Sequence, residues 1–261
     1  MLTRKQRSLL HTLHRRRVRE REGLFLAEGP RVVRDLVASS LECLFVVSSS
    51  SFADSEGGVA LSEALEGRAP LVRVEDEAFA DVSRTETPQG ILAVARIPAV
   101  ALDGLALATG DVALALDGVQ DPGNVGTLAR TAEALGASVL IVLEGTADPW
   151  GPKVVRAAAG ALFRLPTPRA PSADCVAWCR RENARILVAD RSGGPIRSLR
   201  RDALRPTLLV LGNEAAGGGP TMAAAADAKV AVPQCSVADS LNVAAAGAIL
   251  LWELLAGEEP E

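Results

Sequence analysis

The chain has 261 residues, 48% of them hydrophobic, which is enough for one large domain or two modest domains with apolar cores. No apolar run reaches membrane-spanning length, and the N-terminus has neither the apolar centre nor the small-residue cleavage site of a signal peptide. The net charge of −4 hides an asymmetry, because residues 1–34 carry ten Arg or Lys against three Glu. A basic segment on an acidic body is typical of a phosphate-binding arm, although a solvated charged helix explains it equally well.

The four cysteines have no CxxC spacing. Cys175 and Cys179 are four residues apart on an expected helix, and this spacing favours a reduced structural pair over a metal site. We therefore expect a cytoplasmic protein without a bound metal and without a membrane segment.

The first part of the chain contains four short apolar runs that are typical of strands. A helix is expected directly after the run 24–29, where Pro30 suits a first helical turn, and a short helical stretch is expected at 62–67. The expected strands lie at 24–29, 42–49, 70–74 and 90–97. The segment 98–111 lacks a strong period, so we predict a first domain at 1–98, a linker at 99–110 and a second domain at 111–261.

The second part alternates strands and helices. Strands are expected at 111–117, 138–144, 184–190, 206–214 and 228–234, helices at 124–135, 173–183 and 240–255, and a helix that runs into a strand at 150–166. This alternation predicts an α/β fold with a parallel sheet covered by helices on both faces. Ligands of such sheets bind at the carboxyl ends of the strands, which draws attention to the residues after Asp117, Leu211 and Val232.

The first strand end reads DGVQDPGNVGTLAR. Pro122 and Gly123 turn the chain, and Asn124 is expected to cap the following helix. Arg130 falls outside the stripe expected to be buried and can face the strand ends, although an ordinary surface arginine explains its position as well. The predicted buried stripe consists of Val125, Leu128, Ala129, Ala132 and Leu135.

The other two strand ends are LGNEAAGGGP (211–220) and VPQCSVADSLNV (232–243). Glycines in the former allow close approach of a ligand, and Glu214 places a carboxylate at the mouth of the sheet. In the latter, Ser240 is expected to cap the final helix and Asn242 to lie in its first turn. The glycines match neither the dinucleotide-binding pattern G-x-G-x-x-G nor the P-loop pattern G-x-x-x-x-G-K-[ST].

Together and in this order, the three segments resemble the three motifs of the SpoU (TrmH-type) RNA ribose 2′-O-methyltransferases of the SPOUT superfamily. Upstream, LFLAEGPRVVRDL (24–36) and TPQGILAV (87–94) resemble the small α/β RNA-binding domain, related to a ribosomal-protein fold, of the rRNA-modifying branch. The sequence departs from the family pattern at Ala215, Gly218, Gln234, Ser236 and Ala244, in loops that contact the cofactor.

The resemblance implies a catalytic domain with a C-terminal trefoil knot, a homodimer, and S-adenosylmethionine bound in the knot largely through backbone groups. The cofactor-binding residues it implies are Leu211, Gly212, Asn213, Val232, Pro233, Gln234 and Leu241. The catalytic residues it implies are Arg130, Asn124, Glu214, Ser240 and Asn242. The expected RNA-binding residues are Arg15, Arg16, Arg17, Arg19 and Arg130.

The family assigns the base role to the arginine at position 130, but a guanidinium resists deprotonation in proteins. We therefore expect Arg130 to clamp the RNA phosphate first and to act as base only secondarily. Asn124 and Asn242 would orient Arg130 or the ribose, Ser240 would hydrogen-bond within the site, and Glu214 would brace its loop.

The implied reaction is S-adenosylmethionine-dependent 2′-O-methylation of a ribose in ribosomal RNA, with 23S rRNA as the expected target. A tRNA methyltransferase and a catalytically silent RNA-binding or ribosome-assembly protein remain as alternatives. Because only 3% of the residues are aromatic, RNA recognition should depend on phosphates and shape rather than on base stacking. Removal of residues 1–22 is expected to weaken RNA binding and to leave cofactor binding intact.

Overall fold

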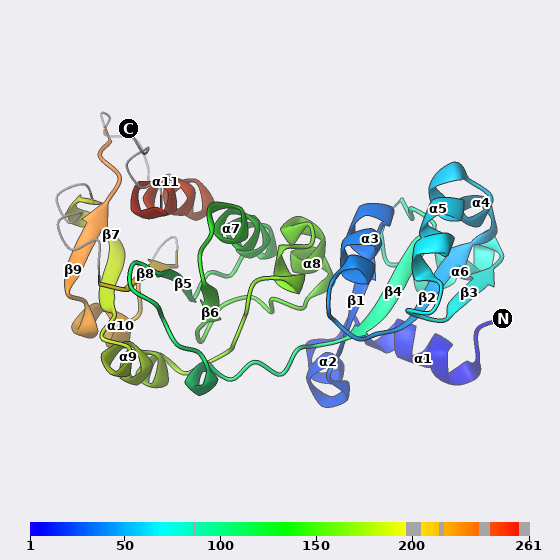
Figure 1. Cartoon of the computed structure of the whole chain (residues 1–261), viewed down its shortest axis with the longest axis horizontal. Helices are drawn as coiled ribbons and strands as arrows, with labels where there is room; N and C mark the ends of the chain where they lie inside the picture. Colours follow the sequence, from blue (N-terminus) through cyan, green and yellow to red (C-terminus); the bar gives the residue numbers. More distant parts are fainter. Residues whose placement is uncertain (86, 197–204, 214–216, 235–240, 256–261) are drawn as a thin grey trace. The chain divides into compact units, whose positions relative to one another are not determined.

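The computed structural model describes residues 1–85, 87–196, 205–213, 217–234 and 241–255 (Figure 1). It contains two compact units. Unit 1 comprises Met1–Pro98 and Trp150–Arg164, and unit 2 comprises Ala99–Pro149 and Leu165–Glu261. Within the described ranges, every helix is too short or too polar to span a bilayer.

Unit 1 is built on a mixed four-stranded sheet in the order β1-β4-β2-β3. Strand β4 is antiparallel to both β1 and β2, and β3 is parallel to β2. The strands are β1 (Leu24–Glu28), β2 (Cys43–Ser49), β3 (Leu71–Val74) and β4 (Ile91–Arg96). The helices are α1 (Arg4–Thr12), α2 (Arg16–Glu22), α3 (Pro30–Ala38), α4 (Ser50–Ala53), α5 (Glu56–Leu65), α6 (Asp76–Val82), α8 (Pro152–Ala158) and the 3₁₀ helix η2 (Ala161–Phe163).

The basic N-terminal segment forms two short helices, α1 and α2. Thr3 caps α1 by accepting the Gln6 N–H, and the apolar face of the segment places Leu10 and Leu13 in the core with no exposed surface. Residues 1–22 are therefore part of the packed unit rather than a separable arm. Removal of residues 1–22 would therefore open the core and would not test RNA binding alone. Substitution of the exposed arginines in this segment leaves the core intact.

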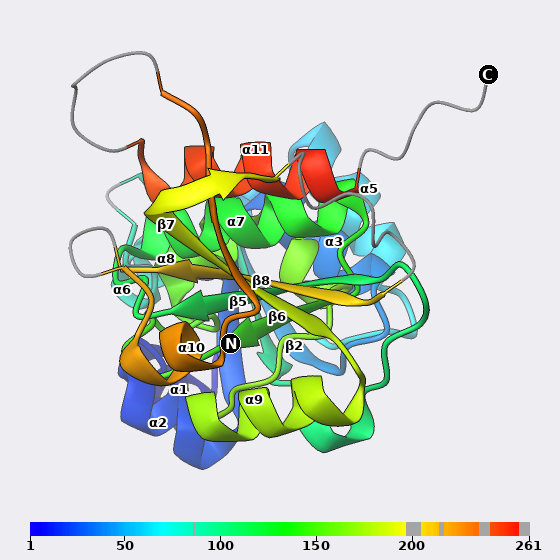
Figure 2. The same ribbon diagram turned by 90° about the vertical axis from the view of Figure 1, so that its left-hand side faces the viewer.

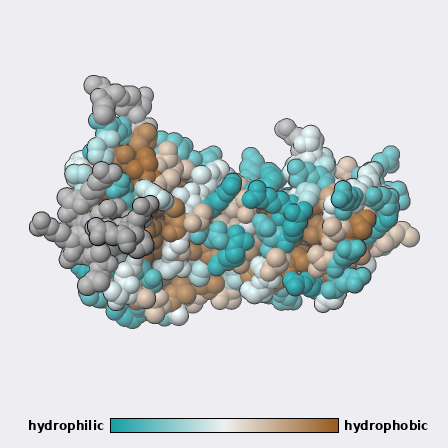
Figure 3. All heavy atoms as spheres, turned by 45° about the horizontal axis from the view of Figure 1, so that its top comes forward, coloured by the Kyte–Doolittle hydropathy of each residue, from teal (hydrophilic) through white to brown (hydrophobic). Residues whose placement is uncertain are grey.

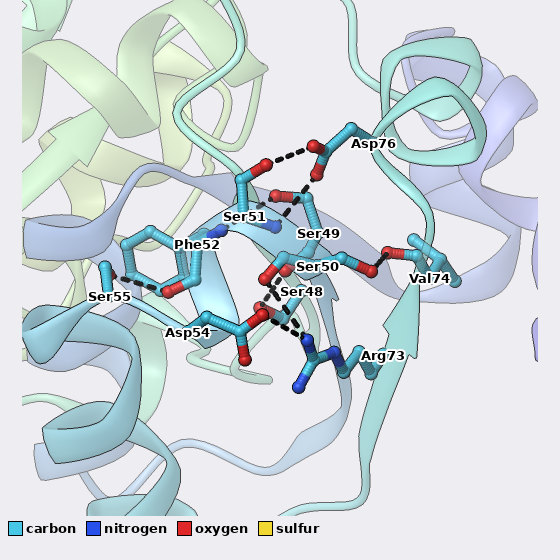
Figure 4. Close-up of polar contacts among 10 residues, drawn as sticks. All are labelled: Ser48, Ser49, Ser50, Ser51, Phe52, Asp54, Ser55, Arg73, Val74 and Asp76. Atoms are coloured by element: carbon cyan, nitrogen blue, oxygen red, sulfur yellow. Dashed lines mark hydrogen bonds and ion pairs between the residues drawn. The ribbon is translucent and has the colours of Figure 1, made fainter.

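A serine-rich turn closes the carboxyl ends of β2 and β3 (Figure 4). Ser49 caps α4, and the Ser50 hydroxyl donates to the Val74 carbonyl oxygen at 3.1 Å. The Ser51 N–H donates to Asp76 Oδ1 at 3.0 Å, and the Ser51 hydroxyl also donates to this carboxylate. These hydrogen bonds are internal, so the serines stabilise the turn.

The segment Trp150–Arg164 packs on β1. The Phe25 ring lies 4.7 Å from the Trp150 ring and 5.8 Å from the Phe163 ring, between centroids, and all three side chains are buried. Helix α8 ends at Ala158. The next two residues, Ala159 and Gly160, adopt positive φ, and η2 follows them. The expected helix over 150–166 is present, but the expected strand after it is not.

Residues 166–170 run beside β6 (Val139–Val142) without forming a strand. Leu140 and Val142 donate N–H groups to the carbonyl oxygens of Pro166 and Pro168, and Val142 and Arg169 form an isolated bridge. Proline has no N–H, so the two prolines cannot complete a ladder. The strand expected at the end of 150–166 is replaced by η2, and the residues that follow make only an edge contact with β6.

Unit 2 is built on a five-stranded parallel sheet in the order β6-β5-β8-β7-β9. Besides β6, its strands are β5 (Val112–Asp117), β7 (Arg185–Pro195), β8 (Thr207–Gly212) and β9 (Ala228–Ala231). Its helices are α7 (Pro122–Leu135), α9 (Ser172–Arg181), α10 (Pro220–Ala225), α11 (Val243–Leu255) and the 3₁₀ helix η1 (Leu102–Gly104). Helices α7 and α11 cover one face and α9 and α10 the other (Figure 2), which confirms the predicted α/β fold with a parallel sheet.

The central strands β5 and β8 are buried throughout, as expected for strands covered on both faces. Leu208 and Val210 pack with Cys175, Cys179 and Met222 on the α9–α10 face. Cys175 and Cys179 are free thiols there, as predicted. In the opposite layer, α7 buries Val125, Leu128, Ala129 and Ala132 but leaves Leu135 only half-buried.

Candidate active site at the carboxyl ends of the parallel strands

The first two sequence motifs begin at neighbouring strand ends. Strands β5 and β8 are paired in parallel, and their last residues, Asp117 and Gly212, are register partners. The loop that leads into α7 and the loop that follows β8 therefore leave the sheet side by side. This is the edge at which parallel sheets bind their ligands.

Helix α7 is capped by Asp121 and not, as predicted, by Asn124. Asp121 Oδ1 accepts the Asn124 N–H at 2.8 Å, and Pro122 occupies the first helical position. Both Asp and Asn are good caps, so the choice was open in sequence, but Pro122 at the first position favours Asp121. The Asn124 side chain is consequently not used to cap its own helix.

The first and third motifs are joined by a direct hydrogen bond between side chains that are 118 positions apart. Asn242 Nδ2 donates to Asn124 Oδ1 at 3.0 Å. Asn242 Oδ1 also accepts the N–H groups of Ala244 at 2.8 Å and Ala245 at 3.3 Å. Asn242 therefore lies just before α11 and caps it, whereas we expected Asn242 inside the first turn and Ser240 as the cap. Ser240 lies outside the described residues.

The second motif requires glycine at its first position. Asn213 and Gly217 exchange two backbone hydrogen bonds of 2.9 and 2.8 Å, with Gly217 at φ +72°. A Cβ atom on Gly212 would lie 2.1 Å from the Gly217 carbonyl carbon, so no other residue fits there. Glu214 and Ala215 lie outside the described residues.

Asn213 and Thr146 hold the loop that follows β5. Asn213 Nδ2 donates to the Gly118 carbonyl oxygen at 3.1 Å. Thr146 Oγ1 accepts the Gly118 N–H at 3.0 Å and donates to the Leu116 carbonyl oxygen at 2.8 Å. Thr146 was not predicted from the sequence, because a single threonine after a strand does not form a recognisable motif.

Asp117 joins the same network from the end of β5. The side chain is 8% exposed, and Asp117 Oδ2 accepts the Gly219 N–H at 2.7 Å. Burial raises the pKa of the Asp117 carboxyl; the Gly219 N–H opposes this rise, and the charge of Glu144 adds to it. Sequence reasoning used Asp117 only as a strand end, because its partner is a backbone N–H that no residue type in the sequence reveals.

The other expected cofactor-binding residues lie at or beyond strand ends. Leu211 is 1% exposed, and its side chain lies under α11. Val232, Pro233 and Gln234 follow β9, with Val232 half-buried and the other two exposed. Leu241 is exposed beside Asn242.

Arg130 lies on the exposed side of α7, two turns beyond the first turn that contains Asn124. Among the residues that the structure describes, it has no hydrogen-bond or ion-pair partner. The guanidinium is thus available to a phosphate, but the structure does not bring it into contact with Asn124 or Asn242.

The expected RNA-binding arginines of unit 1 divide into two groups. Arg15 and Arg17 are exposed, and Arg16 is exposed in an ion pair with Glu20 at 2.7 Å. Arg19 is only 4% exposed, and its Nη1 donates to the carbonyl oxygens of Leu13 and His14 at 2.7 and 2.8 Å. Arg19 therefore stabilises the α1–α2 turn, which corrects its prediction as a phosphate ligand.

These strand-end loops suit a ligand that is bound through main-chain groups. Gly118 and Gly217 adopt positive φ, and Gly217, Gly218 and Gly219 follow one another, so the backbone is not shielded by side chains. The residues present thus fit S-adenosylmethionine, which resembles a nucleoside with an amino-acid tail. Across the described ranges, no group of three or more His, Cys, Asp or Glu is arranged to hold a metal ion.

Comparison with protein families decides the relationship. Residues 111–252 match the model of the SpoU rRNA Methylase family, and residues 8–93 match the MRM3-like substrate binding domain. The chain belongs to the SpoU rRNA methylase family. The predicted resemblance is thereby confirmed, and it extends to both parts of the sequence.

Named relatives of this SpoU chain methylate ribosomal RNA. The Bacillus subtilis 23S rRNA (guanosine(2553)-2′-O)-methyltransferase RlmP is 32% identical over 246 residues, which cover 93% of this chain and 92% of RlmP. A Streptomyces viridochromogenes 23S rRNA (uridine(2479)-2′-O)-methyltransferase is 35% identical over 65% of this chain and 61% of its own length.

Solved structures of SpoU relatives have the same fold over nearly the full chain. The SpoU methyltransferase AviRb from Streptomyces viridochromogenes, in complex with the cofactor AdoMet, matches with a TM-score of 0.88 and 27% identity over 98% of both chains. An AdoMet-bound rRNA methyltransferase from Sinorhizobium meliloti matches with a TM-score of 0.86 and 29% identity over 97% of this chain and 95% of its own.

Proposed function

We propose that this SpoU chain transfers a methyl group from S-adenosylmethionine to a ribose 2′-hydroxyl of ribosomal RNA, with 23S rRNA as the target. The observation that carries the proposal is the Asn124–Asn242 hydrogen bond, which joins two distant motifs beside the adjoining ends of β5 and β8. The named activities of the full-length relative RlmP and of the AdoMet-bound neighbours support the donor and the substrate class.

S-adenosylmethionine, when bound, supplies the sulfonium methyl group. The residues that would hold it lie at or just beyond the ends of β8 and β9 and before α11, and they are Leu211, Gly212, Asn213, Val232, Pro233, Gln234 and Leu241. Asn124 and Asn242 orient one another and so fix the start of α7 against the start of α11. Glu214 and Ser240, which lie outside the described residues, complete the proposed set.

Arg130 is proposed to bind the RNA phosphate and to polarise the 2′-hydroxyl. Its exposed guanidinium has no partner among the described residues, and a planar guanidinium offers two parallel N–H donors to a phosphate. Holding the hydroxyl in line with the methyl group is the largest contribution that such a site makes, on the order of 7–11 kcal/mol. A base role for Arg130 is kept as the secondary alternative.

We also propose that the chain works as a homodimer with a C-terminal trefoil knot, as the family resemblance implies. Helix α11 supports the dimer, because Ile249 is 42% exposed and Trp252 58% exposed on it. Figure 3 shows hydrophobic surface on the upward face of unit 2, where α11 lies in Figure 1. A second copy would cover this surface and would bring its own strand-end loops beside Arg130.

Unit 1 is proposed to read the RNA, with residues 1–98 as substrate domain, 99–110 as linker and 111–261 as catalytic domain. The match of residues 8–93 to the MRM3-like substrate binding domain supports this division. On this proposal, Arg15, Arg16 and Arg17 contact phosphates, and the enzyme acts in the compartment where ribosomal RNA matures.

A methyl-transfer assay tests the proposal. The chain is incubated with S-adenosylmethionine carrying a radiolabelled methyl group and with either bulk rRNA lacking the modification or bulk tRNA, and the label in 2′-O-methyl nucleosides is counted. We expect incorporation into rRNA. Incorporation into tRNA alone would support the tRNA alternative, and RNA binding without incorporation would support a catalytically silent protein.

A further inference from the structure

The buried carboxylate at the end of β5 has no part in the five-residue catalytic set. Asp117 is one of the few charged side chains that are buried among the described residues. Burying a carboxylate is unfavourable unless hydrogen bonds stabilise it. The bond that stabilises Asp117 comes from the Gly219 N–H, at 2.7 Å.

Gly219 ends the glycine-rich loop that follows β8 and directly precedes α10. The loop begins at Gly212, the register partner of Asp117 on the neighbouring strand. Asp117 therefore contacts the start of this loop through the sheet and its end through the carboxylate. The contact is close, because a Cβ atom on Gly219 would lie 3.0 Å from Asp117 Oδ2.

Asn213 makes the complementary connection. Its Nδ2 donates to the carbonyl oxygen of Gly118, the residue after Asp117, while its backbone pairs with Gly217. The end of β5 and the loop after β8 are thus linked by two hydrogen bonds, both donated from the β8 side to acceptors on the β5 side.

We propose that Asp117 is a positioning residue for the methyl donor: by binding the Gly219 N–H, it fixes the described residues 217–219, which follow the strand end at which the donor is expected to bind. The role rests on the proposed function, because the donor is expected to contact this loop. Asp117 itself acts through Gly219 and does not contact the reacting atoms.

The variants Asp117→Ala and Asp117→Asn separate this role from simple burial. Alanine removes the acceptor, whereas asparagine keeps an oxygen for the Gly219 N–H and removes only the charge. Asp111 is the matched control, because it precedes the same strand and its Oδ2 accepts the Ala108 N–H at 2.8 Å at the opposite end of the sheet. Asp111→Ala removes a bond of the same kind away from the proposed donor site.

Two readouts are measured on the full chain. Calorimetric titration with S-adenosylmethionine gives the donor Kd, and hydrogen–deuterium exchange reports the protection of the segment 217–222. For Asp117→Ala we expect donor affinity about tenfold weaker, as for the loss of a hydrogen bond to a charged group, and faster exchange in this segment. Asp117→Asn should restore both, and Asp111→Ala should change neither.

The role of Asp117 is overturned if Asp117→Ala is folded, by its circular dichroism, and binds the donor as the wild type does. It is also overturned if Asp117→Asn loses as much affinity as Asp117→Ala, because the acceptor would then not be the deciding feature. A wild-type chain that binds no donor would instead overturn the proposed function, and this role with it.

Discussion

Asn242 uses the two ends of one amide for two different purposes. Its oxygen caps α11, and its nitrogen donates to Asn124. The two contributions can be separated because aspartate keeps the capping oxygen and lacks the N–H donor.

We predict that Asn242→Asp keeps the stability of the fold but slows methyl transfer. Asn242→Ala should both lower the stability and slow methyl transfer. Loss of the cap should lower the free energy of unfolding by about 1 kcal/mol. Loss of the bond to Asn124 should slow methyl transfer at least about tenfold. Urea unfolding and single-turnover rates check the two parts, and equal stability of the two variants would contradict the capping role.

Arg130 offers a second test at the level of a single residue. Arg130→Lys keeps the charge but cannot make a bidentate contact, so we predict that RNA affinity falls about tenfold together with the methyl-transfer rate. Arg180→Lys, on the exposed side of α9, is the control. Normal RNA affinity with a collapsed rate would contradict the phosphate-clamp role and favour Arg130 as the base.

At the level of elements, α11 can lie against α7 and β8 only because of one glycine. A Cβ atom on Gly247 would lie 2.5 Å from both Leu128 Cδ2 and Leu211 Cδ1. The adjoining side chains are fully buried and cannot move aside without disturbing the core.

We predict that Gly247→Ala lowers the free energy of unfolding by about 1–3 kcal/mol, the usual cost of overpacking a core. It should also lower donor affinity, because α11 carries Asn242 at its start. Gly194→Ala in β7 is the control, since nothing lies within 4 Å of the added methyl group. Thermal unfolding of the two variants measures the difference, and equal melting temperatures would show that α11 adjusts freely.

The sequence was informative where burial decides structure. The strands β5 and β8 were predicted within two residues of their ends because their residues are continuously apolar and buried on both faces. The ends of helices were harder. Asp121 and Asn124 are both good caps, and the strand expected at the end of 150–166 is a 3₁₀ helix that follows the positive φ angles of Ala159 and Gly160.

The site was predictable as three motifs but not as a set of contacts. Nothing in the sequence shows that Asn242 binds Asn124, because the two are far apart in the chain. Arg19 has the same charge as Arg15 and Arg17, and only the fold reveals that it is buried on backbone carbonyl oxygens. Asp117 was missed because its partner is a backbone N–H, which carries no residue-type signal.

At the level of the whole molecule, the charge of unit 1 should determine how RNA binding responds to salt. Arg15→Gln combined with Arg17→Gln should weaken RNA binding and reduce the slope of log affinity against log salt by about 0.7 for each phosphate that is no longer neutralised. The combined variant Arg73→Gln and Arg96→Gln removes the same charge from exposed arginines that are paired with Asp54 and Glu42. Filter binding at several salt concentrations checks this, and equal slopes for both variants would contradict a specific α1–α2 surface.

The proposed dimer gives a second prediction at this level. Trp252→Glu places a charge on the exposed apolar face of α11, so dimer affinity should fall at least about a hundredfold. Val59→Glu is the control, because Val59 is a similarly exposed apolar residue of α5 in unit 1. Light scattering after size-exclusion chromatography measures the mass, and a dimeric Trp252→Glu chain would place the interface elsewhere.

The packing of Trp150–Arg164 on β1 means that the backbone crosses between the two units three times, after Pro98, after Pro149 and after Arg164. One proteolytic cut within 99–110 would therefore break the only covalent link of residues 1–98, but the segment 150–164, still joined to unit 2 at both ends, would hold them by its packing on β1. A fragment that stops at residue 98 would leave Phe25 without its aromatic neighbours, and one that starts at residue 111 would retain a segment whose apolar side chains are deprived of their binding surface. Unit 1 is thus built from two separate stretches of the chain, and the sequence of unit 2 is interrupted by one of them.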